Sequence, residues 1–139
     1  MSLHADPALG LTGRYMSDAG TLLKLDAKVR SDGDWMGLHI HLPVGDLQGQ
    51  MTLGFACKGS APSYTMVSPC IRSGTDEGFR DCFFEKHILF HDESTTHIDA
   101  LAIGHQDDLP LFAKWRQIVL FLPVESFELT LEDFRVFLA

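Results

Sequence analysis

The sequence feature that most constrains the fold is the stretch from residue 21 to residue 42. Apolar and polar residues alternate there on both sides of an Asp-Gly pair. The pair Asp32-Gly33 favours a two-residue turn of a primed type, because both residues tolerate positive φ angles. Such a turn would pair Ser31 with Asp34 and fix the register of two antiparallel strands. The apolar pairs would be Val29 with Met36, Ala27 with Leu38, Leu25 with Ile40, and Leu23 with Leu42. The sequence therefore predicts a β-hairpin with one apolar face.

The other face of this hairpin would carry ionisable and aromatic side chains. Asp26 would lie opposite His39 as a cross-strand charge pair. A second turn at Gly45-Asp46 would add a third strand, in which Thr52 also lies opposite His39. We expect this polar face to be the ligand-binding or interface surface. Its candidate residues are Asp26, Trp35, His39, His41 and Thr52.

The rest of the chain also indicates short strands separated by Gly, Asp and Ser turns. Strands are expected at residues 11–16, 64–71, 118–122 and 127–131, the third as a central strand because it is apolar on both faces. Residues 79–91 and 96–103 are expected to pair as a second hairpin. Residues 1–10 lack periodicity and are expected to be a loose leader.

One short helix is expected near residue 110, because Asp108 could cap it and Pro110 suits a first turn. Together these elements predict an all-β fold of seven to nine strands, as an antiparallel β-sandwich, jelly roll or barrel. At 139 residues the chain has the length of a single domain, which we expect to span residues 1–139.

Composition excludes several classes of partner. A net charge of -8 repels phosphate backbones, so we expect no nucleic acid as partner. The longest apolar run, residues 118–124, is far too short to span a bilayer, and the N-terminus shows no secretory pattern. The three cysteines, Cys57, Cys70 and Cys82, form no CxxC motif and are expected to be reduced thiols. We therefore expect a cytoplasmic protein without a membrane partner.

Two histidines in a His-x-His arrangement are the strongest chemical signal. Two residues apart on a strand, His39 and His41 leave the same face roughly 7 Å apart at the backbone, and can converge on one metal ion. From Gly33 to Gly54 the chain resembles the first motif of the cupin family, with Asp46 where that family has Glu. The family's second motif has no counterpart. The resemblance implies a jelly roll with His39, His41 and Asp46 as ligands of a divalent transition metal, and His87 or His91 as the fourth.

Two functions follow from these observations. The first is a non-catalytic β-domain, without a cofactor, that binds an apolar small molecule, another protein or a second copy of the chain. Ten Phe, two Trp and five Met supply apolar area for such contacts. The alternative is a metal-dependent, cupin-like enzyme that uses His39, His41 and Asp46. We favour the first, because the second cupin motif has no counterpart in the chain. The sequence also contains no GxSxG motif, phosphate-binding loop or dinucleotide fingerprint, which removes most hydrolase, kinase and dehydrogenase functions.

Overall fold

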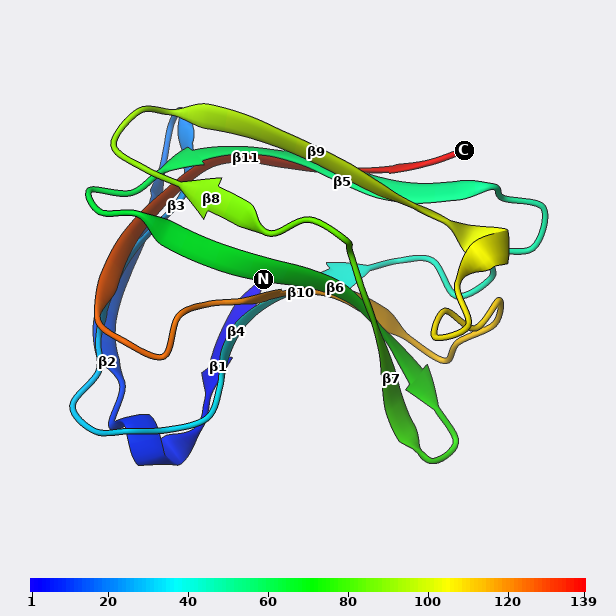
Figure 1. Ribbon diagram of the computed structural model, residues 1–139, viewed down its shortest axis with the longest axis horizontal. Helices are drawn as coiled ribbons and strands as arrows, with labels where there is room; N and C mark the ends of the chain where they lie inside the picture. Colours follow the sequence, from blue (N-terminus) through cyan, green and yellow to red (C-terminus); the bar gives the residue numbers. More distant parts are fainter.

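Two antiparallel β-sheets pack face to face in the computed structural model, which describes residues 1–139 apart from the side chain of Asp18. Figure 1 shows the two layers. The strands are β1 (Ser2–Ala5), β2 (Thr12–Asp18), β3 (Thr21–Lys28), β4 (Met36–Leu42), β5 (Thr52–Ser60), β6 (Thr65–Thr75), β7 (Gly78–Phe83), β8 (Ile88–Phe90), β9 (Thr95–Ala102), β10 (Arg116–Phe121) and β11 (Phe127–Leu138). Two 3-10 helices, η1 (Pro7–Leu9) and η2 (Ile103–His105), connect strands.

The strand order of each sheet brings distant segments together. Sheet A has the order β1-β4-β10-β6-β7, and β8 pairs with β6; sheet B has the order β2-β3-β11-β5-β9. All the strand pairs are antiparallel, which confirms the predicted antiparallel β-sandwich. Eleven strands form instead of seven to nine, because the N-terminal segment and residues 88–90 each add a short one.

The predicted hairpin over residues 21–42 is wrong. β3 belongs to sheet B, where Leu25 pairs with Tyr15 and Leu129, while β4 belongs to sheet A, where Ile40 pairs with Ile118. Alternation shows which side of a strand is buried, but two strands that face each other across a sandwich show the same pattern as two neighbours in one sheet. The two apolar faces therefore contribute to the same core from opposite layers.

Tertiary packing replaces the predicted Asp-Gly turn. Gly33 is not among the glycines with positive φ, and a Cβ there would come within 2.6 Å of the Leu9 Cγ atom. Leu9 is fully buried in the core and its carbonyl accepts a hydrogen bond from the Arg30 amide at 2.9 Å. The segment from residue 29 to 35 thus packs on η1 while it crosses between the sheets. The prediction that residues 1–10 form a loose leader is therefore wrong, because this segment is part of the fold.

The other two predicted pairings are also wrong. β5 pairs with β11 and β9 in sheet B, so the turn at Gly45-Asp46 does not join it to β4. β8 pairs with β6, and β9 pairs with β5, so residues 79–91 and 96–103 form no hairpin. In each case the chain crosses to the opposite sheet where a short turn was expected.

No helix forms near residue 110 in the part of the chain that the structure describes. The carbonyl oxygens of Pro110 and Leu111 accept hydrogen bonds from Arg116 Nη2 at 2.6 and 3.0 Å. In a helix they would accept from amides four residues later. The buried guanidinium therefore holds this segment in an irregular path.

The core between the sheets is apolar and closely packed. β10 lies between β4 and β6, as predicted for residues 118–122, and Ile118 and Leu120 are almost fully buried. The Phe55 ring stacks on Phe134 with ring centroids 5.3 Å apart. The three cysteines are free and buried, which agrees with the expected reduced thiols. Among the described residues, no helix is long and apolar enough to cross a membrane.

Candidate ligand-binding face on sheet A

The outer face of sheet A is the side turned away from sheet B. On β10, Ile118 and Leu120 point into the core, so Gln117, Val119 and Phe121 point outward. The same alternation places His39 and His41 of β4 outward. Figure 1 shows that sheet A curves, with β1 on one side and β7 on the other turned away from sheet B. The outer face is therefore concave.

A row of four polar side chains crosses this face at right angles to the strands. The register places Gln117 beside His41 on one side and beside Arg72 on the other, and Arg72 beside Asp81. We call His41, Gln117, Arg72 and Asp81 the polar row. Each of the four comes from a different strand. The β6–β7 hairpin brings Arg72 and Asp81 together, and the sheet order places Gln117 and His41 beside them.

A bidentate ion pair closes the polar row at the β7 edge. Arg72 donates from Nε to Asp81 Oδ1 and from Nη2 to Asp81 Oδ2, both at 2.8 Å. This planar geometry is the strong form of a charge-assisted hydrogen bond, and it raises the pKa of Arg72 above its ordinary value. The side chains are 15% and 19% exposed, so the pair reaches solvent without being free to move. It presents donors and acceptors in a fixed arrangement.

Aromatic rings lie on both sides of the polar row. Phe79 packs under Arg72, with the guanidinium carbon 3.9 Å from the ring centroid, and Trp115 lies over Gly74, the register partner of Phe79. On the other side, Phe83 stacks on Phe121 at 5.8 Å. Phe79 is 56% exposed, Phe83 52% and Trp115 39%. Large aromatic rings exposed together mark a binding surface more often than a bare monomer surface.

A depression adjoins this face at Gly74. It has a volume of about 350 Å³ and is lined by Gly74, Thr75, Asp76, Phe112, Ala113 and Lys114. Lys114 Nζ and Asp76 Oδ1 form an ion pair across it at 2.6 Å. The aromatic side with Trp115 therefore continues into a depression with a mixed lining, in which Phe112 and Ala113 lie beside the Lys114–Asp76 ion pair.

His39 lies next to the polar row and is 8% exposed. Its Nδ1 atom is 3.0 Å from Gln117 Oε1, and its ring meets the ring of His4 edge-on with centroids 4.7 Å apart. Burial lowers the pKa of His39, and the charges of His4 and Arg72 add to this effect. The Gln117 hydrogen bond and the charge of Asp81 act in the opposite direction.

The floor of the face is apolar and chemically inert. Val119 and Cys70 are fully buried beneath the side chains described above. Burial raises the pKa of the Cys70 thiol to about 12, and the charge of Asp81 contributes to this. A thiol with this pKa stays protonated at neutral pH and is a poor nucleophile. The face offers stacking and hydrogen bonding rather than a nucleophile.

Only part of the predicted ligand face assembles. His39 and His41 share one face, as predicted. Asp26, however, lies on sheet B in register with Arg14 and Glu128, so its predicted pairing with His39 is wrong. Thr52 begins β5 in sheet B, and Trp35 lies in the connection between the sheets, where its carbonyl accepts from the Asp6 amide. The five residues do not form a single site.

The predicted metal ligands do not assemble either. Asp46 lies in the loop after β4, where its side chain accepts from the Gln48 amide at 2.8 Å. His87 Nδ1 lies 2.8 Å from Ser68 Oγ. Across the described residues, no three His, Cys, Asp or Glu side chains are placed to hold a metal ion. The part of the chain that the structure describes therefore does not bring His39, His41, Asp46 and His87 together as one cluster of metal ligands.

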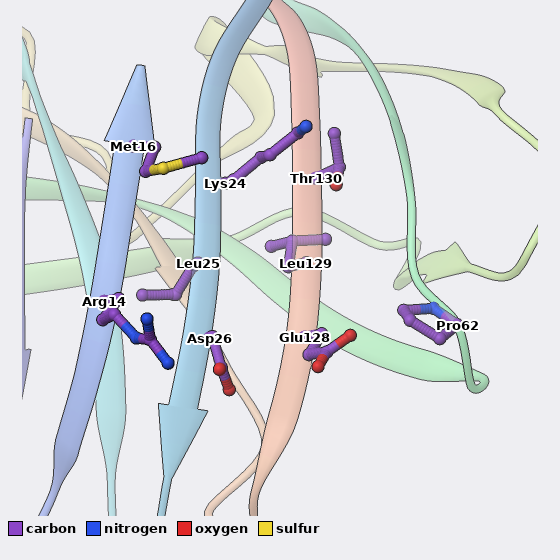
Figure 2. Close-up of a pocket in the computed structure, with 9 residues that line it drawn as sticks. All are labelled: Arg14, Met16, Lys24, Leu25, Asp26, Pro62, Glu128, Leu129 and Thr130. Carbon is purple, nitrogen blue, oxygen red and sulfur yellow. The ribbon is translucent and has the colours of Figure 1, made fainter. Parts of the chain in front are cut away.

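A second depression lies on the outer face of sheet B. Figure 2 shows its side chains on β2, β3 and β11, with Pro62 reaching over from a loop. It has a volume of about 290 Å³ and is lined by Arg14, Met16, Lys24, Leu25, Asp26, Pro62, Glu128, Leu129 and Thr130. Charges of both signs line it, but no aromatic ring does. It lacks the stacking surface of sheet A, so we place the candidate site on sheet A.

Sequence reasoning missed Arg72, Asp81, Gln117, Phe79 and Trp115. A signal existed for two of them, because Arg72 and Asp81 are placed symmetrically about the turn between β6 and β7. The sequence analysis instead pairs residues 79–91 with residues 96–103, so the two strands that flank this turn were not paired with each other. Gln117 and Trp115 gave no signal, because the sequence indicates a strand only from residue 118, whereas β10 begins at Arg116.

No family model and no curated protein matches this chain. Among solved structures, it resembles the CBM22-1 xylan-binding domain from Paenibacillus barcinonensis Xyn10C, with a TM-score of 0.64 and 10% identity over 98% of this chain and 85% of that one. It also resembles the family 11 carbohydrate-binding module of the cellulosomal cellulase Lic26A-Cel5E of Clostridium thermocellum, with a TM-score of 0.61 and 14% identity over 99% and 87%. At these identities, the likeness establishes a shared β-sandwich fold.

Proposed function

We propose that the chain is a non-catalytic glycan-binding module that binds a polysaccharide across the outer face of sheet A. The observation that carries this proposal is the polar row with exposed aromatic rings on both sides. The likeness to a xylan-binding domain supports it, as does the likeness to a family 11 module solved in complex with a β-1,3-1,4-mixed-linked tetrasaccharide.

The chemistry of the face suits a sugar better than a purely apolar ligand. A pyranose ring has an apolar C–H face that packs on an aromatic ring and a rim of hydroxyl groups that need hydrogen-bond partners. Phe79 and Phe83 would supply the packing surface, and Arg72, Asp81 and Gln117 the hydrogen bonds. Because aromatic rings and polar groups alternate on this face, we propose a sugar as the ligand, where composition alone led us to expect an apolar small molecule.

Charge indicates that the glycan is neutral. Arg72 and Asp81 cancel each other at the β7 edge of the row. Gln117 between them and His41 is uncharged. The net charge of -8 therefore arises outside the polar row, and an uncharged polysaccharide would meet no opposing field there.

Isothermal titration calorimetry with soluble mixed-linked β-glucan and with xylan tests the proposal. Arg72→Met and Asp81→Asn should each weaken binding about 10- to 100-fold, because each removes a charge-assisted hydrogen-bonding group from a fixed pair. Phe79→Ala should weaken it by a similar factor through lost stacking. Ile98→Ala is the matched control, because Ile98 is 59% exposed on β9 of sheet B. Absence of binding to both polysaccharides by the wild-type chain would overturn the proposal.

A further inference from the structure

The hydrogen bond between His39 and Gln117 fixes the orientation of the Gln117 side chain. His39 is almost fully buried, and its Nδ1 atom lies 3.0 Å from Gln117 Oε1. Because a carboxamide oxygen only accepts hydrogen bonds, Nδ1 must carry the proton and donate it. Burial lowers the pKa of His39, so the ring is neutral at pH 7 and has no second N–H group. The Gln117 oxygen is therefore held by His39 on the β4 side of β10.

The carboxamide nitrogen of Gln117 is consequently turned away from β4. The carboxamide group is planar, and its oxygen and nitrogen diverge from one carbon. β10 lies between β4 and β6 in sheet A, so a nitrogen turned away from β4 points toward β6 and the solvent above it. The register partner of Gln117 on β6 is Arg72. Among the hydrogen bonds of the described residues, the Gln117 side chain takes part only through Oε1, which leaves both hydrogens of Nε2 for a ligand.

The guanidinium of Arg72 offers a donor to the same space. Its Nε and Nη2 atoms both donate to Asp81 on β7. Because the N–H groups form a rigid planar fork, the remaining nitrogen, Nη1, points away from β7 and hence toward β10. The Asp81 pair and the Phe79 ring, 3.9 Å from the guanidinium carbon, hold the group in place. Arg72 Nη1 and Gln117 Nε2 are therefore two fixed donors that approach one space, and the described residues supply no acceptor between them.

We propose that His39 is a positioning residue of the glycan site, which fixes Gln117 so that Gln117 Nε2 and Arg72 Nη1 donate together to one oxygen of the bound sugar. This rests on the glycan-binding function proposed above, and it names what the sugar must supply at this point: an oxygen that accepts two hydrogen bonds. A hydroxyl oxygen has two lone pairs and meets this requirement, whereas an N–H group or an apolar edge of a ligand does not. His39 itself stays in the sheet and acts through Gln117.

The opposite tautomer of His39 would give the site a different chemistry. With its proton on Nε2, the ring would accept from the Gln117 nitrogen, and Gln117 Oε1 would face the sugar as an acceptor. A proton on Nε2, however, would place a buried N–H group where the described residues offer no hydrogen-bond partner. A proton on Nδ1 has an acceptor at 3.0 Å. The burial of one ring nitrogen thus decides that Gln117 donates to the sugar.

Nitrogen-15 NMR of the histidine rings at pH 7.5 tests the orientation before any sugar is added. His39 Nδ1 should resonate as a protonated nitrogen and Nε2 as an unprotonated one, and the reverse would overturn the inference. This measurement needs no variant, so it is decisive even where a substitution prevents folding. On addition of soluble mixed-linked β-glucan, or of xylan if that is the polysaccharide that binds, the side-chain NH₂ resonances of Gln117 should shift. Those of Gln50, which is exposed in the loop before β5, should not.

Calorimetry with the same polysaccharide tests the role of His39. His39→Leu removes the donor and should weaken binding about five- to tenfold, whereas His39→Asn, which restores an N–H group near the place of Nδ1, should stay within about twofold of the wild type. Gln117→Leu should weaken binding by a factor similar to His39→Leu, and the double variant should lose no more, because His39 acts only through Gln117. His97→Leu is the matched control: His97 is a half-buried histidine of sheet B, also with an unpaired Nε2, and its loss should leave binding unchanged.

Two sets of results separate this inference from the function on which it rests. Wild-type affinity in His39→Leu, or a further loss of affinity when His39→Leu is added to Gln117→Leu, would refute the positioning role and leave glycan binding in place. If the wild-type chain bound neither β-glucan nor xylan, the glycan-binding proposal would fail, and the positioning role of His39 would fail with it.

Discussion

Replacing the buried Arg116 with methionine should destabilise the fold by about 2–4 kcal/mol. Arg116 is fully buried. Its Nη1 donates to Ser73 Oγ at 2.7 Å, and its Nη2 contacts the carbonyl oxygens of Gly45, Pro110 and Leu111 at 3.2, 2.6 and 3.0 Å. No carboxylate forms an ion pair with it among the described side chains, so burial lowers the pKa of Arg116.

The magnitude follows from which acceptors lose their donor. Gly45 O still accepts from the Ala113 amide at 2.9 Å and Leu111 O from the Leu47 amide at 2.8 Å. Pro110 O and Ser73 Oγ lose the guanidinium donor, at about 1–3 kcal/mol each. The two lost hydrogen bonds together would cost about 2–6 kcal/mol. Removing a buried charge that has no counter-ion offsets part of this cost, so we expect a net destabilisation of about 2–4 kcal/mol.

Urea unfolding followed by circular dichroism measures this difference. Arg80→Met is the control, because Arg80 is exposed on β7 and its loss should change the free energy of unfolding by less than about 0.5 kcal/mol. Arg116→Lys should fall between the two, since an ammonium group replaces only some of the hydrogen bonds. If Arg116→Met unfolded within about 0.5 kcal/mol of the wild type, the buried guanidinium would not hold the segment at residue 110.

Two further predictions concern pH and thiol chemistry. Burial lowers the pKa values of His39 and His97 below 6.5, so the unfolded chain binds more protons than the folded one as the pH falls through that value. The free energy of unfolding should therefore fall from pH 7.5 to pH 5.5, less steeply in a His39→Phe, His97→Phe double variant, and a slope unchanged by both substitutions would contradict this. Burial raises the pKa values of Cys57 and Cys82 to about 11 and of Cys70 to about 12. An aromatic disulfide reagent at pH 8 should therefore react with the three thiols quickly in urea but slowly in the folded chain, and fast reaction in both would refute their burial.

The sequence predicted strands and their buried faces better than strand partners. Residues 118–122 and 127–131 form strands, and Leu25 and Leu38 point into the core as expected. A period of two reports only that one side of a strand is buried. Two strands with apolar faces can be neighbours in one sheet or lie opposite each other in the two sheets. Contacts between residues distant in sequence decide which arrangement forms. The sequence therefore predicted correctly that Leu25 is buried, but it predicted Ile40 as the partner of Leu25 instead of Tyr15 and Leu129.

Local turn signals failed for a related reason. An Asp-Gly pair lowers the free energy of a tight turn by a small amount, while burying Leu9 under Gly33 removes a whole leucine side chain from water, at about 1.5–3 kcal/mol. The N-terminal segment that supplies Leu9 has no periodicity, so its part in the fold was invisible in the sequence. The larger tertiary contribution determined the path of residues 29–35.

The candidate site depends on the same crossing between layers. Had β3 and β4 formed a hairpin, Asp26 would lie beside His39, and the two would form a charge pair of the kind found on many solvated sheet faces. Because β4 instead pairs with β10, His39 lies beside Val119, with Gln117 within hydrogen-bond distance. β10 then brings in β6 and β7 with the Arg72–Asp81 pair. The strand crossings that made the predicted pairing wrong therefore assemble one continuous face from three distant segments: β4, β10 and the β6–β7 hairpin.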